Sequence, residues 1–335
     1  MNKNIKTINK KLLIIGNGFD RDHSLPTGYI DFKKYLSNSI RVNEGMEISD
    51  ECIILPEIPK PSYPHIMIKG ELKTDYENEK KIVYWLIDDV AREKRDMKWG
   101  DFENYLGQLR VEKAIEKWKG DEFDIQYLKN SIVSITGFFF EWINTIDLSE
   151  AKKKEKYLSI INKKNDIAIS FNYTETLESL YEMKSQNICY IHGQRETDPV
   201  LQHEKSMSSL GKDNSDLVVG FDKKYLTNNT RKSILTPLYK NTTSIIYHYK
   251  DFFDSIATSE IKEIYSLGFS FSDVDMPYII KICDSLKRKQ GIKKVTWYIT
   301  PYGNFLSQIR EELHMRKCIW NAGFRGRVRK VKWCK

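Results

Sequence analysis

Residues 16–18, Gly-Asn-Gly, follow a short apolar stretch, and their types suit the binding of a phosphate group. Gly16 and Gly18 allow backbone conformations and close ligand approaches that a β-carbon would block. Pro26 and Thr27 then precede a helical pattern that Thr27 can cap. Free backbone N–H groups and the helix dipole at such a helix start favour an anion. The stretch therefore predicts a phosphate cradle.

Three further polar stretches follow later apolar runs. If these runs are parallel strands, the polar residues meet at the carboxyl edge, where open sheets bind ligands. Asn172 follows the first run, although together with Glu175 it also fits a helix cap. His192 ends the second run, a place where a lone histidine is often a hydrogen-bonded structural residue. The third stretch could bind ribose hydroxyls or cap a helix, and its candidate residues are Gly268, Ser270, Asp273 and Asp275.

Apolar runs without alternation predict strands that are buried on both faces, as in a parallel sheet. The expected strands cover residues 12–15, 167–171, 188–191, 217–219, 264–267 and 295–299. The expected helices between them cover residues 175–183, 245–256, 276–286 and 305–315. This alternation implies right-handed crossovers and a sheet with helices on both faces. The predicted fold class is α/β, Rossmann-like and doubly wound, with a mainly parallel sheet and a helical insertion.

The middle of the chain interrupts this sheet pattern. A polar and then proline-rich loop is expected from Ser37 to about Pro64, followed by helical spacing at 76–118 and 125–146. We therefore predict a nucleotide-binding domain at 1–36 and 165–335. A mostly helical insertion at 37–164 is expected to fold beside or over the ligand-binding cleft at the carboxyl edge of the sheet.

The amino-acid composition indicates the class of protein to which the chain belongs. The chain has 335 residues, 40% of them hydrophobic, which is enough for a buried core. Its apolar runs are too short for a signal peptide or a membrane span, and its five scattered cysteines fit free thiols in a reducing cytoplasm. The net charge of +8 fits anionic small substrates or nucleic acid. The basic run at 324–333 is expected to be an edge strand, with nucleic-acid contact as the second interpretation.

The opening stretch resembles the AbiH-like abortive-infection family of bacterial antiphage proteins. The resemblance rests on Gly16-Asn17-Gly18-Phe19-Asp20, then His23, then Leu25-Pro26-Thr27. Trp99-Gly100-Asp101-Phe102-Glu103 resembles a further feature of that family and equally fits an ordinary helix N-terminus. The family is in turn similar to sirtuin-type NAD-binding proteins. These share a glycine loop, an asparagine after a later strand, a histidine followed by glycine, and a final Gly-x-Ser nucleotide loop.

The resemblance implies an antiphage protein that binds NAD, as a substrate, or a related nucleotide. It assigns Asn172 to positioning ribose or water and His192 to the role of general base, for which a neutral imidazole is suited. The bond to break would join nicotinamide to ribose, and Asp20 or Asp273 could stabilise the oxocarbenium-like cation. Glu103 becomes a candidate acid of the cleft. The residues expected to bind the nucleotide are Gly16, Asn17, Gly18, Phe19, Asp20, His23, Thr27, Gly268, Ser270, Asp273 and Asp275.

Two departures from the sirtuin pattern limit the expected chemistry. The chain lacks the paired cysteines of a zinc module, and Thr174 stands where sirtuins carry an acid. We therefore expect no protein deacylation and no metal. The alternatives are a nucleotide sensor without turnover and a nucleic-acid-binding or nucleic-acid-cleaving effector. Expected partners are a small-molecule nucleotide, a phage-derived trigger or partner protein, and further copies of the chain.

Overall fold

A computed structural model of the chain describes residues 10–61, 66–68, 71–73, 76–92, 103, 106–119, 122–196, 218–289 and 292–333. The chain forms two compact units. The sheet unit comprises residues 1–26, 147–194 and 241–335, and the helical unit comprises residues 27–146 and 195–240. The helical unit thus takes in residues 27–36 and 195–240, whereas residues 147–164 belong to the sheet unit.

A six-stranded sheet forms the centre of the sheet unit. Its strands are β1 (Lys10–Ile15), β4 (Ile167–Ser170), β5 (Ile188–Tyr190), β6 (Ile261–Leu267), β7 (Thr296–Ile299) and β8 (Arg327–Lys330). They lie in the order β5-β4-β1-β6-β7-β8, and every neighbouring pair is parallel. Counted within this sheet, the order is 3-2-1-4-5-6, the arrangement of the Rossmann fold. The predicted fold class is confirmed.

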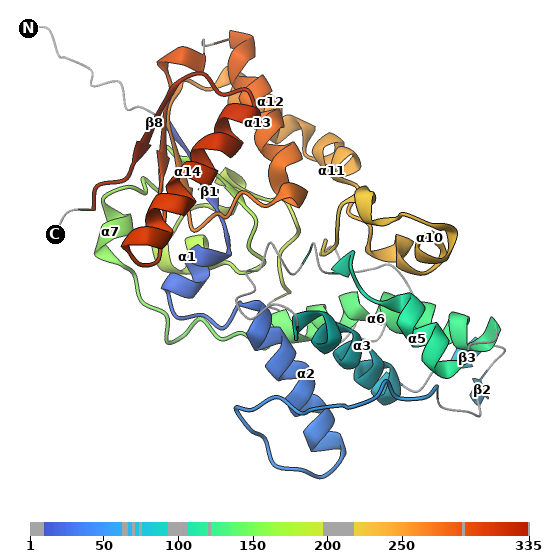
Figure 1. The fold of residues 1–335 in the computed structure, drawn as a ribbon. Coiled ribbons are helices and arrows are strands. Elements are labelled where there is room, and N and C mark those ends of the chain that lie inside the picture. The colour runs from blue at the N-terminus through green and yellow to red at the C-terminus, as the bar shows by residue number, and fades with distance from the viewer. Residues whose placement is uncertain are drawn as a thin grey trace, which may run out of the picture. The chain divides into compact units, whose positions relative to one another are not determined.

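Helices cover both faces of this sheet (Figure 1). Leu12 and Ile14 of β1 belong to a core cluster with residues of α12 (Lys250–Thr258), α13 (Met276–Lys289) and α14 (Phe305–Asn321). Leu13 and Ile15 point to the other face and pack with residues of α1 (Asn17–Asp22) and α8 (Thr176–Tyr181) and with Tyr157 of α7 (Glu155–Leu158). The consecutive apolar residues of β1 therefore fill two cores.

Two expectations for strands had opposite outcomes. The basic C-terminal run forms β8 at the edge of the sheet, as predicted. The strand expected at 217–219 was wrong, because Val218 and Val219 lie outside regular strands, and residue 217 is outside the described part. Nearby, only Phe221 makes a β-bridge, to Tyr239. The apolar character of this segment reflects burial of an irregular loop.

The helical unit contains five main helices among its described residues. They are α2 (Tyr29–Asn43), α3 (Tyr76–Ala91), α5 (Val111–Trp118), α6 (Glu122–Asn144) and α10 (Asn229–Leu235). A short antiparallel hairpin joins β2 (Ile66–Ile68) to β3 (Glu71–Lys73). The N-cap of α2 is Gly28 instead of Thr27, and the Asp31 carboxylate accepts a hydrogen bond from the Gly28 N–H. Because α2 continues to Asn43, the loop begins later than expected.

The remaining helical elements are short. In the sheet unit they are α11 (Thr242–His248), η1 (Ser185–Asn187), η4 (Asp273–Asp275) and η5 (Ile292–Lys294). In the helical unit they are η2 (Lys223–Tyr225) and η3 (Thr236–Leu238). The 3-10 turn η4 begins the approach to α13, directly after the segment that the sequence marks as a ribose-binding candidate.

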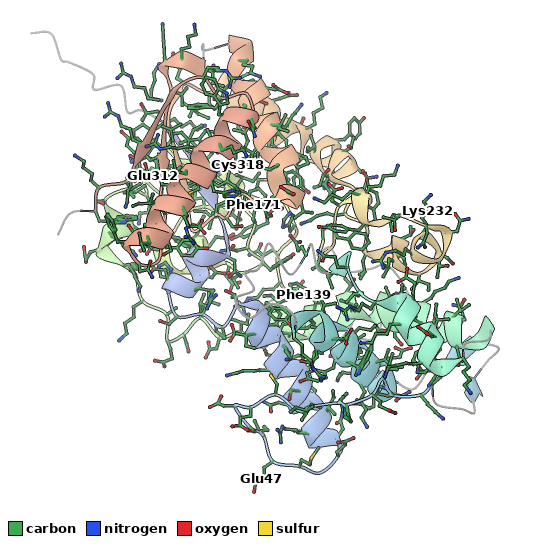
Figure 2. The ribbon with its side chains drawn as sticks, viewed as in Figure 1. Glu47, Phe139, Phe171, Lys232, Glu312 and Cys318 are labelled. Atoms are coloured by element: carbon green, nitrogen blue, oxygen red, sulfur yellow. The ribbon has the colours of Figure 1, made fainter. Side chains whose placement is uncertain are left out.

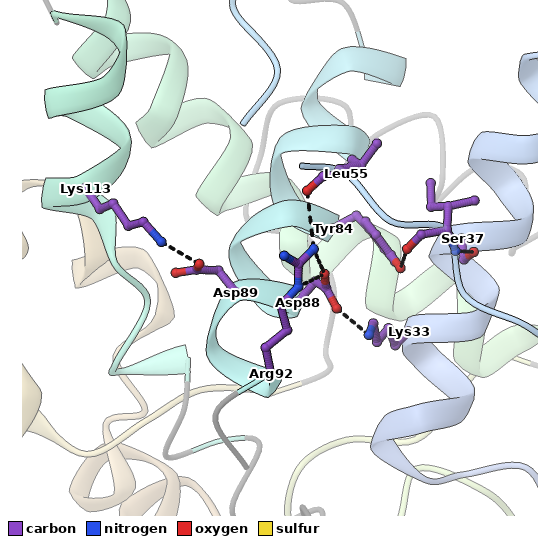
Figure 3. Close-up of polar contacts among 9 residues, drawn as sticks. Lys33, Ser37, Leu55, Tyr84, Asp88, Asp89, Arg92 and Lys113 are labelled. Carbon is purple, nitrogen blue, oxygen red and sulfur yellow. Dashed lines mark hydrogen bonds and ion pairs between the residues drawn. The ribbon is translucent and has the colours of Figure 1, made fainter. Parts of the chain in front are cut away.

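Ion pairs around α3 hold the helical unit together (Figure 3). The buried Asp88 carboxylate pairs with Lys33 of α2 and accepts a hydrogen bond of 2.8 Å from Arg92 Nε. Arg92 also donates to the carbonyl oxygen of Leu55, at 3.3 Å. One residue further along α3, Asp89 accepts a 2.6 Å hydrogen bond from Lys113 of α5. Asp88 therefore connects α3 to α2, Arg92 connects it to the proline-rich loop, and Asp89 connects it to α5.

Candidate functional site

The strand register brings two of the predicted site residues to the same edge of the sheet. Ser170 of β4 pairs with Tyr190 of β5, so Asn172 and His192 each stand two residues beyond a paired position. Parallel strands end at a common carboxyl edge. Asn172 and His192 therefore leave adjacent strands at equivalent positions.

Asp275 completes a polar pair with His192. The His192 Nε2 and Asp275 Oδ1 atoms are 3.4 Å apart, and Ser272 Oγ donates a 2.9 Å hydrogen bond to Asp275 Oδ2. Because β1 and β4 separate β6 from β5 in the sheet, the segment after β6 must cross the ends of both strands to reach His192. A carboxylate in this position can orient the imidazole and stabilise its protonated form.

Aromatic rings enclose this pair. The His192 ring lies 5.3 Å from the ring of Phe171 and 5.7 Å from that of Tyr278, measured between centroids. Only 2% of His192 is exposed. Phe171 is labelled in Figure 2. These contacts fix the position of the imidazole.

The backbone before Ser272 adopts unusual conformations. Gly268 has φ of 63° and Phe271 has φ of 57°, both in the left-handed region. This region suits glycine but disfavours a bulky residue, at a cost of roughly 1–3 kcal/mol. Phe271 is nevertheless fully buried in the core. The packing of Phe271 therefore holds a strained turn directly before Ser272, whose hydroxyl contacts the carboxylate that lies beside His192.

Asn172 is a buried amide at this edge. It is 3% exposed, and within the described part of the chain neither its Oδ1 nor its Nδ2 makes a hydrogen bond of standard geometry. The amide does not cap α8, whose N-cap is Glu175. A buried polar group without any hydrogen bond costs about 1–3 kcal/mol, and the poorly aligned contact of this amide with Asp20 offsets only part of that cost. A ligand that accepts and donates hydrogen bonds here would recover that cost.

Asp20 lies within reach of the same amide. Its Oδ2 accepts a hydrogen bond of 2.5 Å from Thr174 Oγ1, and its Oδ1 accepts one of 2.8 Å from Thr176 Oγ1. Complete burial raises the pKa of Asp20 to about 6, against the lowering effect of hydrogen bonds from Thr174, Thr176 and Asn172. The carboxylate is therefore mostly ionised at neutral pH and can stabilise a nearby positive charge.

Thr174 and Thr176 make contacts at this edge of the sheet that the sequence analysis did not predict. The Thr174 hydroxyl donates a hydrogen bond to the carboxylate of Asp20, which comes from α1. The sequence pattern that could have indicated these contacts is the alternation of Asn172, Thr174 and Thr176 directly after a buried strand.

The glycines of the two loops pack against each other. A β-carbon on Gly268 would lie 2.0 Å from the Phe19 nitrogen, and one on Gly16 would lie 2.6 Å from the Gly268 oxygen. The Gly18 N–H donates to the Gly268 carbonyl at 2.9 Å, and the Gly16 N–H donates to the Leu267 carbonyl at 3.0 Å. The close approach that these glycines allow is thus made by the protein's own backbone, at the point where the strand order reverses.

His23 and Phe19 belong to an aromatic cluster with Tyr157 and Tyr181. His23 Nδ1 is 2.7 Å from the Phe19 carbonyl oxygen, and Nε2 is 2.7 Å from the Tyr181 hydroxyl. Burial lowers the pKa of His23, against the raising effect of the Phe19 carbonyl. The neutral ring can donate from Nδ1 and accept at Nε2. This arrangement gives His23 a structural role in fixing α1.

The remaining predicted residues have other surroundings. In the sheet unit, Asn17 begins α1, Ser270 is partly exposed and Asp273 is exposed. In the helical unit, Thr27 is buried, and Glu103 forms an ion pair of 2.7 Å with Lys240, both side chains being almost fully buried. Residues 99–102 lie outside the described part.

Two kinds of feature are absent from the described residues. No cluster of three or more histidine, cysteine, aspartate and glutamate side chains there could hold a metal ion. The cysteines at 52, 189, 283 and 318 carry free thiols. Within the same residues, no helix is both long enough and apolar enough to span a membrane.

Comparison with known proteins gives one match. The family model described as bacteriophage abortive infection AbiH matches residues 12–300. The matched range includes β1 from Leu12 onward, the strand ends that carry Asn172 and His192, and the segment that carries Asp275. The match confirms the family resemblance of the opening stretch. No curated protein and no solved structure matches the chain.

Proposed function

The chain belongs to the AbiH family of bacteriophage abortive-infection proteins, and we propose that it serves antiphage defence by binding and hydrolysing NAD. The sheet unit would hold NAD, or a closely related nucleotide, as a substrate in the cytoplasm. The observation that carries the proposal is the His192–Asp275 pair at the same sheet edge as the buried Asn172 amide. A base, an orienting carboxylate and a buried amide are groups that can serve hydrolysis at a ribose carbon.

The proposed reaction breaks the bond between the ribose C1′ atom and the nicotinamide nitrogen. The bonding electron pair leaves with nicotinamide and neutralises its positive charge. A water oxygen bonds to C1′, and the water proton moves to His192, which Asp275 orients. The products are nicotinamide and ADP-ribose.

Two further groups support this reaction. The Asn172 amide would hold the attacking water or a ribose hydroxyl. The ionised Asp20 carboxylate, which Thr174 and Thr176 orient, would stabilise the oxocarbenium-like charge in the transition state. Both groups occupy positions that cost stability when no ligand is present, as is common at functional sites.

The direct test measures nicotinamide and ADP-ribose by chromatography after the purified full chain is incubated with NAD. The same products are measured in cells that express the chain, before and after phage infection. His192→Ala and Asn172→Ala should each reduce product formation by about 10²–10⁴-fold. His248→Ala is the matched control, because this exposed histidine lies in α11 and should leave the rate unchanged. The proposal fails if neither setting yields nicotinamide and His192→Ala protects cells as well as the parent.

A nucleotide sensor without turnover is the second candidate. The low exposure of His192 favours it, because an enclosed imidazole is poorly placed to exchange protons with water. Calorimetry with NAD and with ADP-ribose separates the two functions. A sensor would bind NAD and return it intact, and Asn172→Ala would weaken binding, whereas His192→Ala would have a smaller effect.

A further inference from the structure

Helix α14 has a second apolar face in addition to the one that it buries. Met315 and Ile319 pack into the core of the sheet unit. The opposite side of the helix exposes large hydrophobic side chains, which are Phe305 (78%), Leu306 (68%), Ile309 (42%), Leu313 (64%) and Trp320 (60%). A cluster of exposed apolar side chains on one helix commonly marks a protein contact. We call Leu306, Ile309, Leu313 and Trp320 the α14 outer stripe.

The spacing of this stripe is that of a helix pair. Leu306, Ile309, Leu313, position 316 and Trp320 follow one another at intervals of three, four, three and four residues. A 3-4 repeat places these residues along a straight seam between two helices. Arg316 occupies one seam position and forms an ion pair with Glu312 on its own helix, at 2.8 Å.

From this geometry we propose that the α14 outer stripe is the interface between two copies of the chain, with their α14 helices parallel. In a two-fold contact of this kind, each stripe residue meets its own equivalent, so one stripe is sufficient to complete the seam. Leu306, Leu313 and Trp320 recur every seven residues and would form three matched layers. The helix has 17 residues, about 25 Å in length, which is enough for these layers.

The charges beside the stripe favour the parallel direction. Glu312 borders the stripe on one side, whereas Arg310 and Lys317 border it on the other. In a parallel pair, Glu312 faces Lys317 of the partner subunit, five residues further along the helix. An antiparallel pair would instead bring the two basic sides together. Glu312 is labelled on α14 in Figure 2.

Trp320, at one end of the α14 outer stripe, is held in place within a single copy of the chain. The Arg325 guanidinium lies 4.0 Å from the centroid of the Trp320 ring and donates to the Trp320 carbonyl at 2.8 Å. This stacking restricts the ring while leaving its outer surface exposed. A side chain that is ordered before association loses less entropy on binding.

Sedimentation velocity of the purified full chain over a concentration series tests the interface. The parent should change from monomer to dimer as its concentration rises, and Leu313→Asp should weaken association by about 100-fold or more. Circular dichroism of each variant shows whether it is folded. Ile48→Asp is the control, because Ile48 is 70% exposed in the helical unit, and it should associate like the parent. A parent that stays monomeric, or a folded Leu313→Asp variant that still dimerises, overturns the proposal.

A charge exchange tests the direction of the helices. Lys317→Glu should weaken the dimer about tenfold, and the double variant Glu312→Lys/Lys317→Glu should restore it. Leu313→Cys should form a disulfide-linked dimer under mild oxidation, with the parent and its native cysteines as the control. Failure of both the restoration and the cross-link overturns the parallel arrangement.

Discussion

Replacing Asp20 by asparagine should make the protein more stable at neutral pH, which is the reverse of the usual effect of changing a buried residue. Asp20 is completely buried, and its pKa rises from 3.8 to about 6. The folded protein therefore binds the proton of the Asp20 carboxyl more tightly than the unfolded chain does. The resulting stability is complete below pH 3.8 and is lost as the pH rises through about 6. The folded and unfolded pKa values differ by about two units, and one pKa unit corresponds to about 1.36 kcal/mol. The loss in the free energy of unfolding therefore amounts to about 3 kcal/mol.

Asparagine has the same shape but no charge to bury. Its NH2 group would meet one of the two threonine hydroxyls that now donate to the carboxylate, at a cost of about 1 kcal/mol. Asp20→Asn should therefore be about 2 kcal/mol more stable than the parent at pH 7.5 and about equal or slightly less stable at pH 4. Urea unfolding of both proteins between pH 4 and pH 7.5, followed by tryptophan fluorescence, measures the difference.

Asp22, two residues away, provides a control of opposite sign. Burial alone would raise its pKa, but hydrogen bonds from Lys156 and Tyr157 and the charges of Lys156 and Lys154 hold it below the ordinary value. The stability from Asp22 is therefore present above its unfolded pKa and lost as the pH falls. Asp22→Asn should destabilise the protein most at neutral pH. If the difference between Asp20→Asn and the parent does not change between pH 4 and pH 7.5, the reasoning about Asp20 is wrong.

Further variants test the packing of both units. Gly268→Ala should lose about 3 kcal/mol or more in urea unfolding, because φ is 63° and the new β-carbon would lie 2.0 Å from the Phe19 nitrogen. Gly137→Ala in α6 meets nothing within 4 Å and should gain about 0.5–1 kcal/mol. Lys240→Met should cost about 3–5 kcal/mol by leaving Glu103 without its ion pair, and adding Glu103→Gln should recover most of it. Because burial raises the pKa of Cys283 to about 12, iodoacetamide at pH 8 should modify this thiol only after unfolding, as mass spectrometry can show.

The sheet was largely predictable because its strands are apolar on both faces. Leu12–Ile15 is a continuous apolar run, and such runs occur almost only in parallel sheets with two covered faces. The same apolar pattern wrongly predicted a strand at Val218 and Val219, where apolar side chains belong to an irregular loop. Burial produces a similar pattern in both cases, and only the position of neighbouring chain segments distinguishes them.

The candidate site was less predictable because its contacts join distant parts of the chain. Asp20 and Thr174 are 154 residues apart in sequence, and no local pattern reports their hydrogen bond. The sequence marks Gly16 and Gly18 as positions of close approach, but it does not say what approaches them. Gly268 of the protein itself lies there.

The position of β1 has a consequence for how the protein is made. This strand is synthesised before both of its neighbours in the sheet, which begin at Ile167 and Ile261. Until those strands have been synthesised, the four apolar residues of β1 have no native pairing strand, and exposed apolar segments of this kind are prone to aggregation. A prematurely terminated chain cannot assemble the histidine, the asparagine and the late aspartate together. The candidate site can therefore form only after Asp275 has been synthesised.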